Sequence, residues 1–432
     1  MDAKKPEKSG ILPGTLTFQD FIPEAIPPAN EKEKNISYAS FPSTGQAANN
    51  FLANNPDLEV VSCETIAVKL DISQWTGSVK HKSYDTIINQ TSYRQYGENA
   101  LGTINALRLW LRPVTTAVTP QKIGWKTVTS NYHGHHVSLM ELAEQINLQH
   151  KTTPIPGRII NVQSLTFCSK DGPADVESSI WKLTGSEIKS NFTQAFRIFY
   201  IMGEPCRSDI GFADFFPQSD DGKTVKQFSQ IMRDINNFRE GLPGSARFLN
   251  IQTLLCREEL GKPISSMYST HYQTTLFWER FIRFLRVVYL VRPEESKVAP
   301  PAYETPKVTA KLFTPAVIKD PTAFKPLKFE DLEVMRDRLG YWMSQQSAKV
   351  LAVESVSYKV VTGAEKLVGL GAMNTWHETV DDKHGTRATW EMYVRCVRVY
   401  FEGETSDPQG FYWPRSVDDV RKQGKLDQCV II

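Results

Sequence analysis

The spacing of hydrophobic residues predicts a helical block in the middle of the chain. Over residues 186–202, hydrophobic side chains recur at intervals of three and four, which places them on one face of a helix. Residues 224–242 repeat this pattern, and Gly241 and Pro243 stand where a helix is expected to end. The helices that we predict in this block are residues 186–202, 224–242, 246–260 and 273–291.

The part of the chain before this block has a mixed pattern. Residues 138–150 predict a short amphipathic helix, with Ser138 at the N-cap position and Glu141 where a capping box requires it. Other segments show the alternation and β-branched residues that are typical of strands. The predicted strands are residues 58–72, 106–118 and 158–167.

Two further segments favour extended structure. Residues 1–56 are polar with isolated hydrophobic anchors, such as Phe18 to Pro28, and they predict an extended N-terminal arm. Residues 293–328 contain seven prolines and predict a polyproline-II linker or a long crossing connection. Near the end of the chain, residues 329–349 favour a helix, whereas residues 349–361 and 389–402 fit either a helix or a strand.

Together these patterns predict an α+β fold that is predominantly α-helical, with a mixed N-terminal region and an extended N-terminal arm. We find no internal repeat in the sequence. The regions that we expect are the arm (1–56), a main mixed and helical core domain (57–292), the proline-rich linker or crossing (293–328) and a C-terminal α+β region (329–432).

Composition narrows the class of protein. Hydrophobic residues make up 41% of the 432 residues and charged residues 23%, which is ordinary globular usage. The net charge of +2 neither favours nor excludes a nucleic-acid partner. The six cysteines are scattered without a CxxC pair, which favours reduced thiols, and we expect neither a signal peptide nor a membrane span.

No motif predicts catalysis. Asp221–Thr224 (DGKT) resembles the end of a phosphate loop, but Pro217 stands where that loop needs its first glycine. His133, His135 and His136 have no cysteine or carboxylate at ligand spacing nearby, so we interpret them as structural. We therefore expect no catalytic residue, no metal and no cofactor.

Arginines among aromatic residues are the candidate nucleic-acid contacts. Arg280, Arg283 and Arg286 would form one stripe on the predicted helix 273–291, and Arg395 and Arg398 show a similar spacing. Arginine beside aromatic residues suits phosphate contact and base stacking. The alternative is a core helix whose polar edge consists of arginines.

Two short motifs suggest partners. Pro300, Pro301 and Tyr303 form a PPxY sequence, the kind of proline-rich segment that WW domains bind. The last four residues begin with Cys429 and fit the general form of a prenylation signal, although isoleucine is not a usual terminal residue for it. Both motifs would suit a cytosolic adaptor.

In the general order of its segments the chain resembles RNA-virus coat proteins. The polar arm, the mixture of strands and helices and the proline-rich crossing are similar to those of partitivirus capsid proteins, and they equally resemble nucleoproteins of plant negative-strand viruses. The resemblance implies a non-enzymatic protein that assembles with itself around an RNA genome, in the virion and in the host cytoplasm. The alternatives are an RNA-clamping nucleoprotein, which needs its arginine stripe in a basic groove, and the adaptor.

Overall fold

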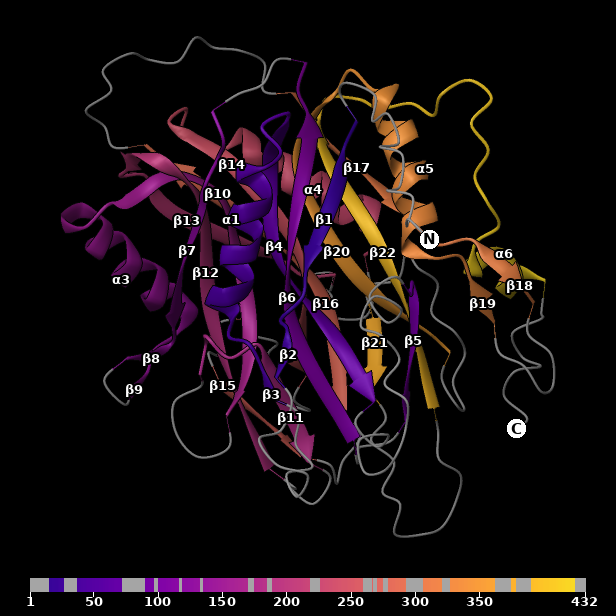
Figure 1. Cartoon of the computed structure of the whole chain (residues 1–432), viewed down its shortest axis with the longest axis horizontal. Helices are drawn as coiled ribbons and strands as arrows, with labels where there is room; N and C mark the ends of the chain where they lie inside the picture. Colours follow the sequence, from indigo (N-terminus) through magenta and orange to yellow (C-terminus); the bar gives the residue numbers. More distant parts are fainter. Residues whose placement is uncertain are drawn as a thin grey trace, which may run out of the picture.

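The fold is mainly β-sheet (Figure 1). The prediction of a predominantly helical protein is therefore wrong. This computed structural model describes residues 15–26, 37–71, 90–96, 100–115, 119–132, 135–169, 175–184, 189–217, 226–258, 266, 270–274, 279–292, 306–320, 327–361, 374–377 and 390–423.

Four structural repeats follow one another along the chain. Each consists of an edge strand, a helix and two long antiparallel strands, of which the second pairs with both the first and the edge strand. Repeat 1 contains β1 (Thr17–Phe21), α1 (Phe41–Ala53), β4 (Leu58–Asp71) and β6 (Ala100–Pro113). Repeat 2 contains β7 (Ile123–Thr129), α3 (Leu139–Thr152), β10 (Ile155–Ser169) and β12 (Lys189–Cys206). Repeat 3 contains β13 (Asp209–Phe215), α4 (Phe228–Glu240), β14 (Ala246–Glu258) and β16 (Glu279–Val291). Repeat 4 contains β17 (Val308–Phe313), α5 (Leu332–Ser344), β20 (Lys349–Val361) and β22 (Trp390–Glu402).

Exchanged strands close the repeats into a ring. Between its two long strands, each repeat has a short strand that pairs with the second long strand of the preceding repeat. The last exchange joins the two ends of the series, because the short strand of repeat 1 pairs with repeat 4. The four exchanges are β11 (Ile180–Thr184) with β6, β15 (Thr270–Thr274) with β12, β21 (Asn374–His377) with β16, and β5 (Ser92–Tyr96) with β22.

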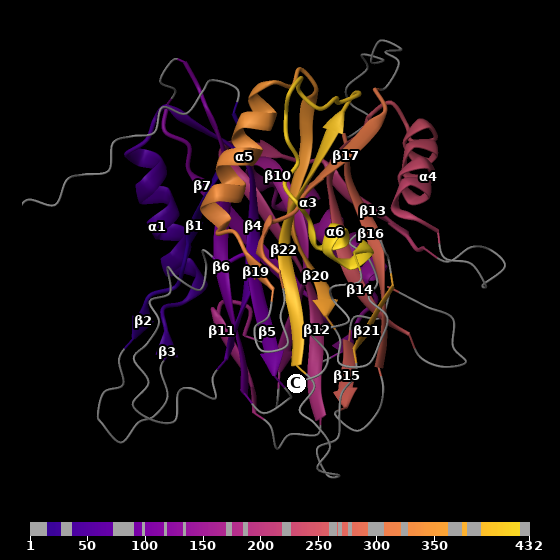
Figure 2. The same ribbon diagram turned by 90° about the vertical axis from the view of Figure 1, so that its right-hand side faces the viewer.

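The hydrophobic core is divided into four equivalent parts. Each lies between the sheets of two successive repeats and is covered on the outside by the helix of the earlier repeat. Figures 1 and 2 accordingly show α1, α3, α4 and α5 on four sides of the strands. The sheets thus pack radially around one axis, as the blades of a β-propeller do.

Small elements complete the fold outside this plan. The short hairpins pair β2 (Ala25–Ile26) with β3 (Ser37–Tyr38), β8 (Asn131–Tyr132) with β9 (His135–His136), and β18 (Val317–Lys319) with β19 (Lys328–Phe329). Helix α6 (Val417–Lys422) packs near the last hairpin in a fifth, smaller hydrophobic cluster. Within the described residues, no helix is long and hydrophobic enough to cross a membrane.

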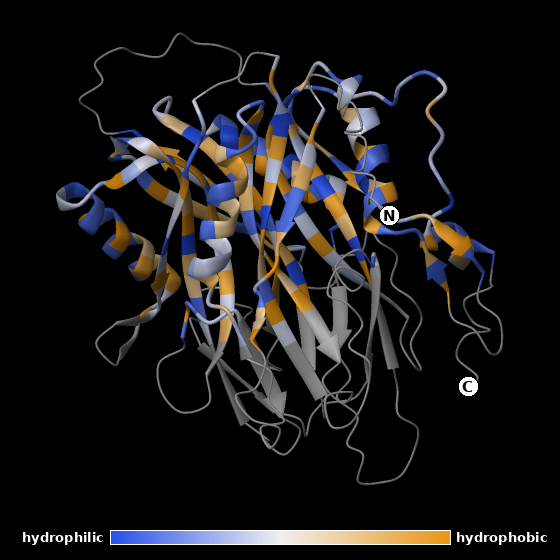
Figure 3. Cartoon of the chain, in the orientation of Figure 1, coloured by the Kyte–Doolittle hydropathy of each residue, from blue (hydrophilic) through white to orange (hydrophobic). Residues whose placement is uncertain are grey.

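Three of the four predicted central helices are wrong. The segments 186–202, 246–260 and 273–291 correspond to the long strands β12, β14 and β16, and only 224–242 contains a helix, α4. The physical reason is burial on both faces. A strand packed between two layers has hydrophobic residues at consecutive positions, and Figure 3 shows many hydrophobic positions along these strands.

The two segments that we expected to be extended also belong to the fold. The predicted arm, residues 1–56, contains β1 and α1, and Leu16, Phe18 and Phe41 are buried. The proline-rich segment 293–328 contains β17, which pairs with β22. By contrast, the predicted helix with its capping box at Ser138 and Glu141 is confirmed as α3.

Candidate functional site

Four polar side chains surround the axis at equivalent positions. They lie on the first long strand of each repeat, three residues after a bulge that all four strands share. All four residues are glutamate or glutamine, and we call them the axial ring. The axial ring consists of Glu64, Gln163, Gln252 and Glu354.

Each side chain of the axial ring binds the backbone of the preceding repeat. Gln163 accepts a hydrogen bond from the Thr65 amide at 2.7 Å and donates one to the Thr65 carbonyl at 2.8 Å. Gln252 does the same with Ser164, at 2.9 and 3.0 Å. A glutamine supplies both a donor and an acceptor, so it satisfies both backbone groups of a residue on the inner edge of a sheet.

The two glutamates complete the ring as acceptors. Glu354 accepts from the Thr253 amide at 2.6 Å and from its hydroxyl at 2.7 Å. Glu64 accepts from the Ser355 amide at 3.0 Å and from its hydroxyl at 2.5 Å, which joins repeat 1 to repeat 4. Burial raises the pKa of the Glu64 carboxyl, although the neighbouring Arg108 acts in the opposite direction.

A buried arginine lies directly across from each member of the axial ring. These arginines are at equivalent positions on the second long strands, and each donates through Nη1 to the serine or threonine hydroxyl of the preceding repeat. The distances are 2.8 Å for Arg108 to Ser355, 2.9 Å for Arg197 to Thr65, 3.0 Å for Arg286 to Ser164 and 2.6 Å for Arg398 to Thr253.

The four arginines differ in their carboxylate partners. Asp20 and Asp214, on the edge strands of repeats 1 and 3, each bind their arginine through two hydrogen bonds of 2.6 to 2.7 Å. Arg398 is paired with Glu354 of the axial ring at 2.9 Å. Arg197 has the hydroxyl of Thr127 where Arg108 and Arg286 have Asp20 and Asp214, and burial lowers the pKa of Arg197 to about 10.

A small cavity of about 40 Å³ lies inside this network. The side-chain oxygens of Asn161 and Asn250 are buried at its wall and have no hydrogen-bond partner among the residues that the structure describes. This volume suits a few water molecules, which would supply the missing donors. Within the part of the chain that the structure describes, no three histidine, cysteine or carboxylate side chains gather as a metal site would require.

The structure does not support the predicted arginine stripe. The segment that contains Arg280, Arg283 and Arg286 is strand β16, so Arg283 and Arg286, three residues apart, face opposite sides of the sheet. Arg286 and Arg398 are buried in the network described above, which leaves them no access to phosphate. The alternative interpretation, in which the arginines belong to the core, fits these two residues, although the element is a strand.

The remaining predicted residues lie in other places. Arg283 is buried against the ring of Tyr358, 4.2 Å from its centroid, and Arg395 is partly buried and donates to the carbonyl of Gln90 at 3.4 Å. The side chain of Arg280 lies outside the described residues, as do Pro300, Pro301, Tyr303 and Cys429. Of the histidine cluster, the structure describes only the backbone of His135 and His136, in β9.

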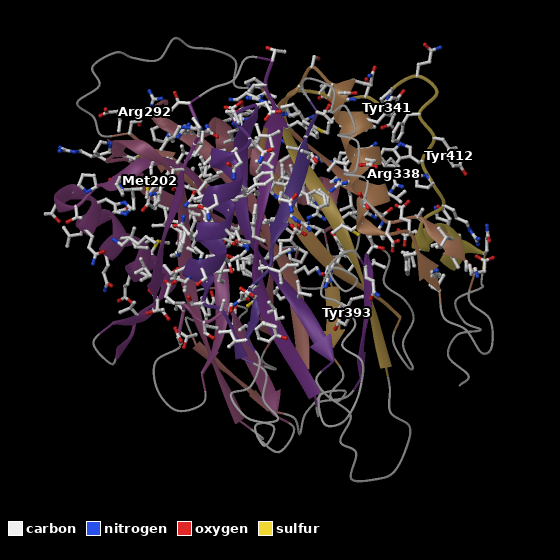
Figure 4. The ribbon with its side chains drawn as sticks, viewed as in Figure 1. Met202, Arg292, Arg338, Tyr341, Tyr393 and Tyr412 are labelled. Atoms are coloured by element: carbon white, nitrogen blue, oxygen red, sulfur yellow. The ribbon has the colours of Figure 1, made fainter. Side chains whose placement is uncertain are left out.

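Sequence reasoning missed a group of exposed arginines at one end of the ring. Arg158 on β10, Arg247 on β14 and Arg292 after β16 lie at the junction of repeats 2 and 3, and we call them the arginine corner. Arg292 donates its amide to the carbonyl of Ser245, two residues from Arg247 (Figure 4). Burial, followed by the charges of Arg292 and Arg158, lowers the pKa of Arg247.

Comparisons with known proteins give no relative for this chain. No family model, no curated protein and no solved structure matches it.

Proposed function

We propose that this chain is a viral structural protein that assembles with itself into a shell enclosing an RNA genome. The observation that carries the proposal is a pair of hydrophobic stripes on opposite sides of a closed ring. The glutamates, glutamines and arginines around the axis are bound to one another and to the backbone, so the surface is the better candidate for contacts with other molecules.

The first stripe lies on the outer face of α3. Met140 is 47% exposed and Leu148 is 67% exposed, and their spacing places them on the same side of the helix. Met140 and Leu148 are eight residues apart on this face, and large exposed hydrophobic side chains on one face of a helix favour a surface that another protein covers.

The second stripe lies on α5 and on the chain beside it. Val334 is 53% and Tyr341 52% exposed, and Tyr412 at 79% is more exposed still. The ring of Tyr341 stacks on Phe411 at a centroid distance of 6.0 Å, so the helix and the segment around Tyr412 form one surface. Figure 4 shows Tyr341 and Tyr412 on the same side of the molecule.

The two stripes belong to repeats 2 and 4, which are opposite one another in the ring (Figure 1). When a protein has two different binding surfaces on opposite sides, one surface of each copy can bind the other surface of the next copy, which gives a head-to-tail arrangement. Such contacts propagate into rings, filaments or larger closed assemblies rather than stopping at a dimer. The helices of repeats 1 and 3 have no large exposed hydrophobic side chain among the described residues, so association has a defined direction.

The carboxylates of the axial ring favour a structural rather than a catalytic role. Glu64 accepts hydrogen bonds from Ser355 and Trp110, and Glu354 accepts from Thr253, Arg398 and Tyr400. A general base needs a free oxygen within reach of its substrate. These groups already have their partners in the fold.

The proposal is tested by placing a charge on each stripe. We expect Leu148→Asp and Tyr341→Asp each to reduce self-association, measured by size-exclusion chromatography with light scattering, because a carboxylate is costly to bury in an interface. Matched controls are Ala47→Asp on α1 and Asn237→Asp on α4, which lie at exposed positions of the other two helices. Wild-type protein that stays monomeric at high concentration would contradict the proposal, and so would equal loss of association in all four variants.

A further inference from the structure

The arginine corner differs from the same positions elsewhere in the ring. Five residues before each member of the axial ring, the first long strand has a charged residue, and the second long strand places a partner across from it. Since the four repeats are equivalent here, repeats 1 and 4 serve as internal controls for repeats 2 and 3.

In repeats 1 and 4 the charge at this position is neutralised within the chain. Glu59 is paired with Arg112 across the strands at 2.5 Å, and Lys349 is paired with Glu402 at 2.7 Å. Glu402 also binds Arg239 at 2.6 Å. At this position in repeats 1 and 4, each charged residue therefore has a partner of opposite sign within the chain.

In repeats 2 and 3 the cation lies across from a hydrophobic residue. Arg158 is opposite Ile201, and Arg247 is opposite Leu290. Within the described part of the chain, neither these arginines nor Arg292 forms an ion pair with a carboxylate. Glu204 on β12 and Asp209 at the start of β13 are the acidic residues at this end of the neighbouring strands, whereas Asp214 of β13 is bound to Arg286 inside the ring. Three arginines against two carboxylates leave the corner with an excess of positive charge.

Contacts between β10 and β14 bring the arginines to one place. Asn250 donates to the carbonyl of Val162 at 3.2 Å, and Gln252 binds Ser164, so the two strands run side by side toward Arg158 and Arg247. Ala246, next to Arg247, pairs with Val291, next to Arg292. The three arginines are thus near one another at exposed positions. Figure 4 labels Arg292 at the upper left.

We propose that the arginine corner binds the phosphate backbone of RNA. The planar guanidinium group forms paired hydrogen bonds with phosphate oxygens, and an RNA strand presents such anions at regular intervals. The three arginines occupy an exposed surface rather than a closed pocket, so they contact the backbone without reading the bases. This inference rests on the proposed function, since it names the residues through which an assembled shell holds its genome.

The test compares the wild-type protein with the triple variant Arg158→Gln, Arg247→Gln, Arg292→Gln. Binding of a mixed-sequence single-stranded RNA oligonucleotide is followed by fluorescence anisotropy over a range of salt concentrations. We expect the variant to bind at least about tenfold more weakly at ~0.1 M salt, and the slope of log affinity against log salt to fall by about 2, because three phosphate contacts are lost.

The control is Lys349→Gln, which removes the cation at the same position of repeat 4 and should leave RNA affinity unchanged. Poly-glutamate and inorganic phosphate serve as competitors. Unchanged affinity in the triple variant overturns the inference, as does displacement of RNA by poly-glutamate at equal charge concentration, which would indicate an acidic protein partner. Displacement by millimolar phosphate would indicate a site for a small anion and also overturns it.

Light scattering on the same samples separates this inference from the proposed function. If the wild-type protein assembles and the triple variant keeps its RNA affinity, only the arginine corner is wrong. If the wild-type protein remains monomeric, the proposed function fails whatever the triple variant does. Thermal unfolding of the variant, whose three substitutions are at exposed positions, verifies that the fold is retained.

Discussion

Arg197 is the arginine around the axis whose partners are all uncharged. Its guanidinium donates to two threonine hydroxyls, of Thr127 and Thr65, and to the carbonyl of Val176, and it lies 3.8 Å from the centroid of the Phe41 ring. A buried cation without a hydrogen-bonded carboxylate costs stability, and burial lowers the pKa of Arg197, although the nearby charge of Glu177 acts in the opposite direction. The same position on the edge strands of repeats 1 and 3 has Asp20 and Asp214.

We therefore predict that Thr127→Asp stabilises the protein. The new carboxylate would bind Arg197 as Asp214 binds Arg286, and the free energy of unfolding should rise by about 1–3 kcal/mol. The reverse change, Asp214→Thr, leaves Arg286 uncompensated and should cost about 3–5 kcal/mol. Chemical denaturation measures both. A Thr127→Asp variant less stable than the wild type would show that Arg197 does not need a charged partner.

A second prediction at this scale concerns His150 on α3. Its side chain is buried, and neither ring nitrogen has a hydrogen-bond partner within the described residues. Burial, with a smaller effect of Lys126, lowers its pKa from 6.5 to about 4. Between these values the unfolded chain binds a proton and the folded chain does not, so stability falls as pH decreases from 6.5 toward 4.

Replacement of His150 by leucine should flatten this dependence. The slope of unfolding free energy against pH in that window should decrease by up to about 1.4 kcal/mol per pH unit. Urea denaturation of both proteins at several pH values measures it. An identical slope in the two proteins would mean that other groups cause the acid sensitivity.

At the scale of the elements, the inner edges of the sheets are satisfied by side chains instead of by further strands. Gln163 and Gln252 do this with an amide, and Glu64 and Glu354 with a carboxylate. The exchanged short strands cover part of the outer edges in the same cyclic sense. Each repeat therefore depends on the next for its hydrogen bonds, which makes the ring a cooperative unit.

At this scale we predict how two substitutions of Gln252 rank in their effect on the stability of the protein. Gln252→Leu leaves both the amide and the carbonyl of Ser164 without a partner and should cost about 2–4 kcal/mol. Gln252→Glu keeps the acceptor, as Glu64 and Glu354 do, and should be less harmful. Thermal unfolding ranks the variants, and a leucine variant as stable as the glutamate variant would show that these hydrogen bonds contribute little.

The sequence predicts some elements well and others poorly, for physical reasons. The capping box of Ser138 and Glu141 is a local signal, and it was read correctly as α3 because its hydrogen bonds form within one turn. The strands β12, β14 and β16 were read as helices because tertiary packing, not local preference, buries both of their faces.

The sequence did not lead us to predict the internal repeat, although a short pattern of residues recurs in all four repeats. Each second long strand contains a hydrophobic residue, an arginine and three more hydrophobic residues, and each first strand has Glu or Gln followed by Ser or Thr. The arginine segments are Leu107–Leu111, Phe196–Tyr200, Leu285–Tyr289 and Val397–Phe401. The repeats share these few core positions and little else, because the rest of each repeat meets different neighbours. The arginine corner carries no sequence signal of its own, since its members come from three segments that are far apart in the sequence.

At the scale of the whole molecule, the fold has four equivalent repeats, but its exposed surface differs from one repeat to the next. The core and the axial network follow the four repeats. By contrast, among the four helices, large exposed hydrophobic side chains occur on α3 and α5, and the arginine corner lies at the junction of repeats 2 and 3. Because the fold does not require these differences between equivalent repeats, we infer that they serve contacts with other molecules. Under the proposed function, the two opposite faces would bind neighbouring copies and the arginine corner would bind RNA, as a coat subunit requires.

The most direct test of this account is electron microscopy of the purified full-length protein, combined with its ratio of absorbance at 260 and 280 nm. The account predicts closed or extended assemblies of regular subunits, with an absorbance ratio raised by enclosed RNA. A monomer free of nucleic acid at high protein concentration would contradict it.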